Sequence, residues 1–390
     1  MAQRIRVGLI YSYSEKWIAG AYYIENLIHA LNTLPDAQKP YLKILSYNEK
    51  DFERIKQIVN YPYLSFFSLN IKYNLLERAI NKIYRTITKQ NLIEKLPNHK
   101  KIDILFPASK GEYFSLISDN RKFFWIPDFQ EDYLPQFFSQ EEIKNRKNHQ
   151  KQLSEKKTNI IFSSQDASND FNRLYPNHQC QTFVLRFAVT HSQTYQELDI
   201  AKIREKYQLP ENYFFSPNQF WAHKNHVVVL KAARLLKEQN IDFCIAFSGK
   251  QEDYRNPEYF KSLEKYVKEN SLENNVKFLG FIERNEQLAL MKHAQAIIQP
   301  SLFEGWSTVV EDAKAMNQTI ILSDLRVHKE QTADYEAKSF FNPNDENDLA
   351  EKILSLQKKR SMDTYEYQAT VKHFGENFMK IVSQAVHHNF

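Results

Sequence analysis

The stretch from Gln299 to Asn317 constrains the fold of this chain more than any other, because a buried strand and a capped helix meet within it. The apolar residues at 296–298 predict a short strand, and a helix is expected to begin near Ser307. Ser307 or Thr308 can cap that helix, because a side-chain oxygen satisfies first-turn backbone N–H groups that have no partner within the helix. Asn317 tolerates the left-handed conformation with which many helices end. The stretch therefore predicts a strand–loop–helix unit.

Carboxylates surround the start of this predicted helix. Glu304 stands just before it, and Glu311 and Asp312 lie on its second turn. The free N–H groups and the positive dipole end of a helix form an anion site. A carboxylate beside such a site does not itself hold a phosphate, and it is better suited to accepting hydrogen bonds from sugar hydroxyls. The combination predicts a nucleotide-sugar ligand.

The same residues resemble the donor-site signature of the retaining GT-B glycosyltransferases of family GT4, in which a Glu is followed after seven residues by a second Glu. The matching positions are Glu304 for the first acid, Gly305 for the glycine, Trp306 for the aromatic residue and Ser307 for the small residue. Asp312 stands where the second Glu is expected, and Glu311 lies beside it. These two positions point about 100° apart on a helix, so one of them is expected to face the ribose, and Asp312 is favoured.

The resemblance implies an α/β protein with the GT-B fold, in which two Rossmann-like domains face each other across a cleft. It covers residues 213–350 well and the first half of the chain loosely. A length of 390 residues also predicts two domains, because single cores rarely grow beyond ~250–300 residues. The expected division is residues 1–189 for the acceptor side and 190–369 for the donor side. A C-terminal helix at about 370–390 is expected to cross back to the first domain.

Composition narrows the class of protein. The 52 basic and 47 acidic residues give a net charge of +5, which is too mild to indicate nucleic-acid binding. Two cysteines, Cys180 and Cys244, indicate a reducing compartment without a disulfide framework. The chain shows no signal-peptide pattern and no run of ~18 apolar residues. We expect a cytoplasmic protein, either free or peripheral on the cytoplasmic face of the membrane.

Gly20 is a candidate donor-binding residue near the first strand. That strand is expected at residues 6–11, followed by a loop with Gly20 and a helix over residues 21–32. In the family, a pair of glycines lets backbone N–H groups approach the donor phosphates here, whereas this chain has Ala19 and Gly20. A plain structural turn explains a single glycine at least as well.

Asp128 follows a strand expected at residues 123–126, and such a loop is where an open α/β sheet places ligands. Its carboxylate suits orienting or deprotonating an acceptor hydroxyl. Capping of the next turn is an equally good alternative. Phe129 and Tyr133 suit stacking on a sugar face, although aromatic residues at this spacing more often lie in a core.

A second strand–loop–helix unit carries the candidate diphosphate-binding residues Asn218, Gln219 and Lys224. The resemblance implies an Arg and, five residues later, a Lys that neutralise the donor diphosphate. Lys224 matches the Lys, whereas Gln219 stands at the Arg position and carries no charge. Lys250 and Arg186 are candidate replacements, although a structural ion pair is the favoured interpretation of Arg186.

Four further donor-side residues come from two later turns. Gly249 and Lys250 follow a predicted strand. Phe281 and Ile282 stand where the resemblance implies that the backbone meets the nucleobase.

His223 and His226 flank Lys224 but lack a third ligand for a metal, so solvated loop histidines are the favoured interpretation.

The segment from Leu75 to Leu96 predicts a basic amphipathic helix. Its apolar stripe consists of Leu76, Ala79, Ile80, Ile83 and Ile87, and its cations are Lys82, Arg85 and Lys89. A helix of this type can lie on an anionic membrane. Packing of the stripe on the sheet is the favoured alternative.

The sequence as a whole indicates a retaining glycosyltransferase that moves a sugar from a UDP-, GDP- or dTDP-sugar to a carbohydrate or lipid-linked glycan, in polysaccharide or glycolipid synthesis. Lys224 and the N–H groups of residues 305–308 would stabilise charge on the leaving diphosphate. Glu304 would hold sugar hydroxyls and Asp128 would place the acceptor, with no metal or other cofactor. The alternatives are an inverting GT-B enzyme, a sugar-nucleotide epimerase, and a catalytically degenerate GT-B partner subunit.

Overall fold

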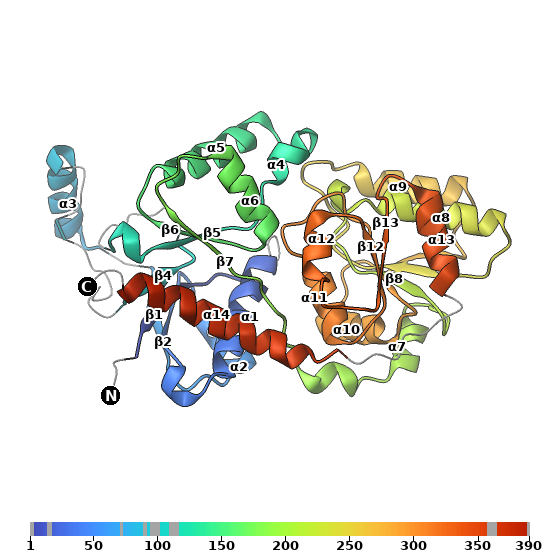
Figure 1. The fold of residues 1–390 in the computed structure, drawn as a ribbon, viewed down its shortest axis with the longest axis horizontal. Coiled ribbons are helices and arrows are strands. Elements are labelled where there is room, and N and C mark those ends of the chain that lie inside the picture. The colour runs from blue at the N-terminus through green and yellow to red at the C-terminus, as the bar shows by residue number, and fades with distance from the viewer. Residues whose placement is uncertain are drawn as a thin grey trace.

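The computed structural model describes residues 4–13, 18–70, 73–88, 92–93, 102–108, 117–356 and 365–387. It contains three parallel sheets flanked by helices, which is the predicted α/β class (Figure 1). We call β1–β7 with their helices the first half and β8–β13 with theirs the second half.

The first half is built on two sheets that meet edge to edge. A four-stranded sheet has the order β3-β2-β1-β4, and a three-stranded sheet has the order β5-β6-β7. A bridge from Leu105 to Lys122 and a 2.7 Å bond from the Ala108 N–H to the Phe123 carbonyl join β4 to β5. The strands are β1 (Arg6–Ile10), β2 (Tyr41–Ser46), β3 (Leu64–Ser68), β4 (Ile104–Phe106), β5 (Phe123–Ile126), β6 (Asn159–Phe162) and β7 (Gln181–Val184).

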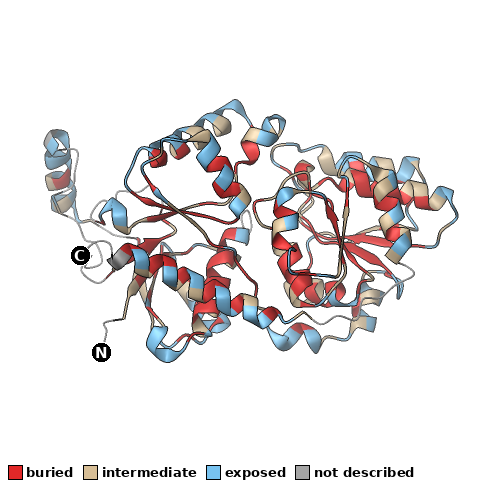
Figure 2. Cartoon of the chain, viewed as in Figure 1, coloured by how far each residue is buried: buried red, intermediate tan, exposed pale blue. Residues whose placement is uncertain are grey.

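The second half is built on one six-stranded parallel sheet with the order β10-β9-β8-β11-β12-β13. Its strands read as short apolar runs because helices cover both faces, and Figure 2 shows them buried between partly exposed helices. The strands are β8 (Phe214–Ser216), β9 (Ile245–Phe247), β10 (Val276–Phe278), β11 (Ile297–Gln299), β12 (Ile320–Ser323) and β13 (Lys338–Phe341).

The described helices follow the strands in the alternation expected of Rossmann-like units. Those of the first half are α1 (Ile18–Asn32), α2 (Glu49–Ile58), α3 (Leu75–Thr88), α4 (Gln130–Tyr133), α5 (Gln140–Ser154) and α6 (Gln165–Leu174). Those of the second half are α7 (Ile200–Lys206), α8 (His226–Glu238), α9 (Tyr259–Glu269), α10 (Arg284–His293), α11 (Thr308–Ala315), α12 (Arg326–Gln331) and α13 (Glu346–Leu356), and α14 (Tyr367–His387) comes last. None of these described helices has the length and apolar character needed to cross a bilayer.

The last helix, α14, crosses from the second half back to the first (Figure 1). Its buried residues Phe374 and Phe378 join the same core as Leu27 and Leu31 of α1. Gly375 allows this approach, because a Cβ there would lie 2.6 Å from the Ala30 carbonyl oxygen. The returning helix of the predicted fold is therefore present.

Two expectations about the first half are wrong. Gly20 does not lie in a loop, because α1 begins at Ile18 and Gly20 is a buried residue of its first turn. The helix α3 does not pack its stripe on the sheet, because Leu76 is 70% exposed and Ile83 is 65% exposed. Figure 1 shows α3 standing away from the body of the molecule. The expected continuation of that helix to Leu96 falls largely outside the described residues.

The division at residues 189/190 and 369/370 stays a prediction. The first of these positions falls between β7 and β8, and the second falls within α14.

The contact between α14 and α1 gives a stability prediction. Gly375→Ala should lower the free energy of unfolding by about 1–3 kcal/mol, because the added methyl group would collide with the Ala30 carbonyl and force the two helices apart. The measurement is urea unfolding followed by circular dichroism. Asn377→Ala, at an exposed position of the same helix, is the control and should leave stability nearly unchanged. Equal stability of Gly375→Ala and wild type would contradict the packing.

Candidate functional site

Glu304 lies in the loop between β11 and α11, at the carboxyl end of the second sheet. Its Oε1 accepts hydrogen bonds from the Lys224 Nζ at 2.5 Å, the Ser301 Oγ at 2.6 Å and the Gln299 Nε2 at 2.8 Å. The side chain is 9% exposed. Burial alone would raise the pKa of Glu304, but the Lys224 ammonium and the hydrogen bonds from Lys224 and Ser301 lower it to about 2. The carboxylate is therefore charged and fixed at one oxygen.

Lys224 reaches Glu304 from the 3-10 turn Ala222–Lys224 that follows β8. The next residue, Asn225, adopts the left-handed conformation with φ of 55° and precedes α8. Its Nδ2 donates to the Pro300 carbonyl at 3.1 Å and to the Pro343 carbonyl at 2.8 Å. Asn225 thus joins the loop that carries Lys224 to the loop that carries Glu304, and this explains why the two side chains meet.

Ser307 caps α11 as predicted, because its Oγ accepts from the Val310 N–H. Asn317 has the expected positive φ of 57° after the helix. The N–H of Ser307 is already bound, since it donates to the Gln331 Oε1 at 3.1 Å while the Gln331 Nε2 donates to the Ser307 carbonyl at 2.8 Å. The expectation that this N–H is free for an anion is therefore wrong for the structure described.

The adjacent acids of α11 face different partners, as the 100° offset predicts. Glu311 accepts from the Tyr367 hydroxyl at 2.5 Å and from the Gln331 Nε2 at 2.8 Å, so it faces α14. Asp312 accepts at a single oxygen from the Arg284 guanidinium at 2.6 Å and from the His191 Nε2 at 2.8 Å. Both acids are almost fully buried.

The pKa values of the two acids are shifted in opposite directions. Burial raises the pKa of Glu311, and the Lys314 ammonium and the Tyr367 hydroxyl only partly oppose this. Burial would also raise the pKa of Asp312, but the Arg284 guanidinium and the His191 hydrogen bond lower it below its ordinary value. Asp312 therefore remains a carboxylate, which accepts hydrogen bonds and donates none.

Asp128 of the first half lies directly against the Glu304 loop of the second half. A Cβ on Gly305 would lie 2.6 Å from the Pro127 carbonyl oxygen and 3.1 Å from the Asp128 Oδ2, so only glycine fits there. Trp306 adds a second contact through its Nε1, which donates to the Phe187 carbonyl at 3.1 Å. The predicted residues Asp128, Glu304 and Lys224 thus form one cluster between the halves.

The predicted capping role of Asp128 is confirmed, because its Oδ1 accepts from the Gln130 N–H at 3.1 Å. Burial raises the pKa of Asp128, and the nearby Glu131 and Glu304 carboxylates add to that effect. An acceptor-orienting role stays a prediction. Of the two aromatic residues, Phe129 lies in the core, while Tyr133 lies between the halves with its ring 5.3 Å from the Phe303 ring.

The remaining donor-side candidates of the β8 and β9 loops lie close together. The Gln219 Oε1 accepts from the Lys250 N–H at 3.0 Å. A Cβ on Gly249, whose φ is +152°, would lie 2.2 Å from the Asn218 carbonyl oxygen. The Lys250 Nζ pairs with the Glu252 carboxylate at 2.9 Å, and both side chains are well exposed. The side-chain carbonyl of Gln219 is therefore bound, and none of the described residues accepts a hydrogen bond from its amide NH2.

Gly280 and its neighbours form the turn beside these loops. Gly280 has a φ of +73°, and its carbonyl accepts from the Gly249 N–H at 2.9 Å. Phe281 is 60% exposed, whereas Ile282 belongs to a buried cluster. The structure thus separates the two predicted base-binding residues: one is available at the surface and the other serves the core.

The prediction that His223 and His226 are solvated is wrong. Both are buried, and the His226 ring stacks on Phe220 at a centroid distance of 4.5 Å. Burial lowers the pKa of each histidine to about 3, and for His223 the Lys224 ammonium adds to the effect. Within the described ranges, no group of three or more His, Cys, Asp or Glu side chains is placed to hold a metal.

Glu330 joins the two halves at the rim of the site, where α12 and α6 lie side by side (Figure 1). Its carboxylate accepts from the N–H groups of Gln165 at 2.8 Å and Asp166 at 3.1 Å, at the start of α6. The Arg186 Nε donates to the same carboxylate at 2.7 Å. The structural ion pair expected for Arg186 is confirmed, so Arg186 does not contact the Lys224–Glu304 pair.

Sequence reasoning missed the residues that hold the two helix acids. His191, Arg284, Gln331 and Tyr367 contact Glu311 or Asp312 from distant parts of the chain. No local motif marks them, because their partners lie 20 to 121 residues away in sequence.

Comparison with known proteins finds a family model that matches part of the chain and solved structures that share the fold of the whole chain. Residues 199–373 match the family model of glycosyl transferases group 1. One relative is the O-antigen chain mannosyltransferase RfbU of Salmonella typhimurium, which is 28% identical over 148 residues, covering 38% of this chain and 39% of the relative. Another is the capsular polysaccharide biosynthesis glycosyltransferase CapH of Staphylococcus aureus, 26% identical over 155 residues, covering 40% of this chain and 42% of the relative. These alignments thus span about two-fifths of each relative.

A solved structure extends the likeness to the first half. Anabaena Alr3699/HepE in complex with UDP and glucose aligns with a TM-score of 0.61 and 17% identity, over 98% of this chain and 96% of that chain. At this identity the likeness shows the fold alone, and it confirms the predicted GT-B class.

The Lys224–Glu304 pair gives a pH-dependent stability prediction. The pKa of Glu304 falls from its ordinary value of 4.5 to about 2 in the folded state. The lowered pKa of Glu304 therefore contributes about 3 kcal/mol to the free energy of unfolding above pH 4.5, and this contribution is lost as the pH falls towards about 2. Glu304→Gln should lower the free energy of unfolding at pH 7, and the difference from wild type should shrink between pH 4.5 and about 2.

Urea unfolding at pH 7 and at several acidic pH values is the measurement. Glu258→Gln, which removes an exposed acid paired with Lys261, is the control and should show little difference at any of these pH values. A constant difference between wild type and Glu304→Gln would contradict the ion pair.

Proposed function

We propose, because residues 199–373 match the family model of glycosyl transferases group 1, that this chain belongs to that family and is a retaining glycosyltransferase. It moves a sugar from a nucleotide-sugar to an acceptor hydroxyl. The observation that carries the proposal is that the Lys224–Glu304 pair of the second half lies against Asp128 of the first half. Sugar transfer needs residues that bind the donor close to a residue that positions the acceptor. The contact between Asp128 and the Glu304 loop provides such a place.

Lys224 stabilises the leaving diphosphate. Its ammonium is held at the site by Glu304 and is 16% exposed, so it is available to an anion that enters. A preorganised cation of this kind lowers the energy of charge that builds on the leaving group in the transition state. Gln219 supplies amide N–H donors but no charge. Lys224 therefore neutralises more of the diphosphate charge than it would in a site that also had an Arg.

Glu304 holds sugar hydroxyls. Three donors converge on its Oε1, and none of the described residues donates to its Oε2. The second oxygen can therefore accept from the donor sugar while the first stays fixed. Hydrogen bonds of this kind hold the donor sugar so that its reacting carbon is correctly oriented for transfer.

Asp128 places the acceptor. Its carboxylate lies beside Gly305 and has a raised pKa, which favours acceptance of a hydrogen bond or a proton from a hydroxyl. Asp312 binds the ribose, because it stays charged and faces Arg284 and His191 between the halves, whereas Glu311 is bound to α14.

The donor and the pathway follow from the relatives as proposals. One structural neighbour was solved with UDP and glucose, so UDP-sugars are the first donors to test, ahead of GDP- and dTDP-sugars. Two relatives are named for O-antigen and capsular polysaccharide synthesis, which supports a carbohydrate or lipid-linked glycan acceptor. The two cysteines are free and buried, in agreement with a cytoplasmic location.

A catalytically degenerate partner subunit is the second candidate, because the uncharged Gln219 weakens the cationic side of the site. Calorimetry with UDP, GDP and dTDP separates the two candidates. A working transferase should bind at least one of them, and a chain that binds none supports the degenerate subunit.

The activity prediction concerns the paired charges. Lys224→Ala and Glu304→Gln should each lower kcat about 10²–10³-fold, because each removes a group that acts on charge or orientation in the transition state. The measurement is sugar transfer from a panel of nucleotide-sugars, with the anomeric configuration of the product read by NMR. Lys231→Ala, a partly exposed lysine of α8, is the matched control.

Retention at the anomeric carbon is the expected configuration, and inversion would assign the chain to an inverting enzyme. A free, unlinked sugar product would indicate the epimerase. Unchanged turnover in both site variants would remove Lys224 and Glu304 from the mechanism.

The ribose prediction separates the two acids of α11. Asp312→Asn should weaken nucleotide binding about 10- to 150-fold, since a charged hydrogen bond to a ribose hydroxyl contributes about 1.5–3 kcal/mol. Glu311→Gln should change affinity little, because Glu311 faces Tyr367 and Gln331. Calorimetry with UDP is the measurement, and the reverse ranking would assign the ribose to Glu311.

A further inference from the structure

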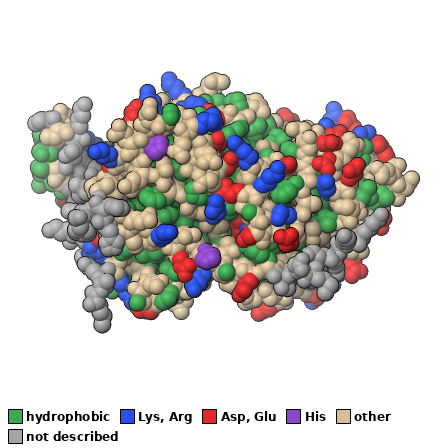
Figure 3. Space-filling model, in the orientation of Figure 1, with side chains coloured by type: hydrophobic (Ala, Val, Ile, Leu, Met, Phe, Trp, Pro, Cys, Tyr) green, Lys and Arg blue, Asp and Glu red, His purple; other side chains and the backbone are tan. Residues whose placement is uncertain are grey.

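The helix α3 presents an apolar face that no described part of the chain covers. Leu75 is 83% exposed, Leu76 is 70% exposed and Ile83 is 65% exposed. Figure 1 shows the helix projecting from the end of the first half that lies farther from the second half, and Figure 3 shows hydrophobic side chains at that edge of the molecule. Exposed apolar surface of this kind marks a binding surface.

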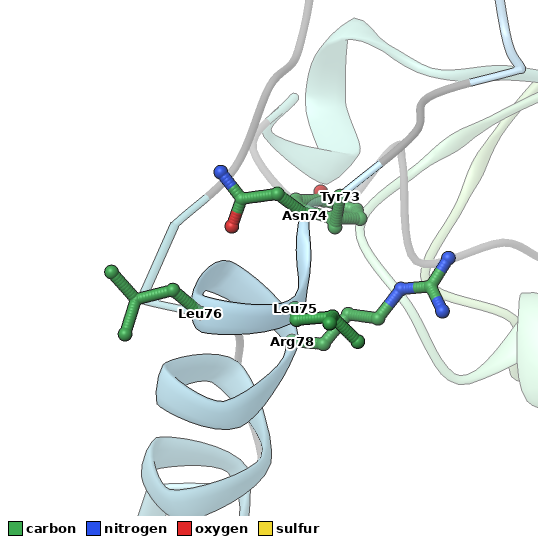
Figure 4. A pocket seen from close by; sticks show the side chains of 5 residues that line it. All are labelled: Tyr73, Asn74, Leu75, Leu76 and Arg78. Atoms are coloured by element: carbon green, nitrogen blue, oxygen red, sulfur yellow. The ribbon is translucent and has the colours of Figure 1, made fainter.

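Three exposed residues and one half-buried residue, Ile80, form one face of the helix. Leu76, Ala79, Ile80 and Ile83 recur at spacings of three, four and seven residues, which places them on one side of an α-helix. Figure 4 shows Leu76 and Arg78 extending to opposite sides of the first turn. The face is therefore continuous and is separated from the charged side chains.

Cations lie on the opposite side of the helix from this apolar face. Arg78, Lys82 and Arg85 are exposed, and Glu77 is the acid of the same helix, so three positive charges and one negative charge leave two positive charges. Basic side chains opposite an apolar stripe are the pattern of helices that lie in the plane of an anionic bilayer surface. The lysine and arginine stems let their charges reach lipid headgroups while the stripe enters the acyl region.

Local bonds rather than packing hold α3 in shape. The Glu77 N–H donates to the Asn74 Oδ1 at 2.8 Å, and the Asn74 N–H donates to the Glu77 Oε2 at 2.8 Å, which forms a capping box. Farther along, the Asn81 side chain exchanges two hydrogen bonds with the Ile93 backbone, at 2.7 and 2.8 Å. The helix therefore has local hydrogen bonds that do not involve its apolar face.

We propose that α3 is a membrane-docking helix that binds the surface of an anionic bilayer. Its charge argues against a second copy of the chain as the occupant, since two helices of the same positive sign repel each other at the contact. The proposal goes beyond the transferase function and does not depend on it.

The test is flotation of the full chain with lipid vesicles, with no donor or acceptor present. Vesicles of phosphatidylglycerol and phosphatidylcholine in about equal parts should bind the protein at least tenfold more tightly than vesicles of phosphatidylcholine alone, because attraction to an anionic surface adds to burial of the stripe. Leu76→Glu and Ile83→Glu should each abolish binding. Lys82→Glu should weaken binding to the anionic vesicles about tenfold and flatten its dependence on salt.

Matched controls come from exposed positions elsewhere. Tyr47→Glu places the same acid at a residue that is 54% exposed, and Lys261→Glu reverses a charge on α9. Both should bind vesicles like the wild type, and circular dichroism should show that all variants are folded.

Three results would overturn the proposal. They are absence of wild-type binding to anionic vesicles, equal binding by the α3 variants, and a concentration-dependent dimer that the α3 variants abolish. The last result would assign the face to a second copy of the chain. Because the assay contains no sugar substrate, its failure leaves the transferase proposal intact, and inactivity in the transfer assay leaves this proposal intact.

Discussion

The buried ion pair between Lys224 and Glu304 is the interaction on which the site depends. Removing either partner leaves an uncompensated charge in a nearly closed environment, which costs several kcal/mol, so the two loops stabilise each other's conformation. Ser301 and Gln299 satisfy the same oxygen of Glu304, and Asn225 ties the loops through their backbones. The carboxyl ends of β8 and β11, which are neighbours in the sheet, are therefore held together as one unit.

A second constraint links this unit to the rest of the molecule. Glu311 bonds to Tyr367 at the start of α14, and Tyr367 also accepts from the Val189 N–H at 2.9 Å. The helix that follows Glu304 is thus connected to the segment after β7 and to the helix that returns to the first half. Close contact of Gly305 with Asp128 completes the arrangement, so groups from both halves meet without an intervening side chain.

Much of the second half could be predicted because its signals are local. The apolar run at 296–298, the Ser307 cap and the Asn317 end each depend on a few neighbouring residues, and the structure has all three. The wrong predictions concern which side chains are buried and which are exposed. His226 looks polar in sequence, yet it is buried against Phe220, and the stripe of α3 looks like a core face, yet it is exposed. Periodicity reports that a helix has an apolar side but not what that side meets.

The sequence by itself determined the α/β class and the strand–loop–helix unit around Glu304, and it predicted the acidic and basic side chains of the candidate site, because these follow from local propensity, capping and side-chain type. Only the tertiary structure decided that the pKa of Glu311 is raised while that of Asp312 is lowered, that Lys224 reaches Glu304, and that Asp128 faces Gly305. The physical reason is that burial and ion pairing depend on groups brought together from distant positions, such as His191 and Asp312, which are 121 residues apart.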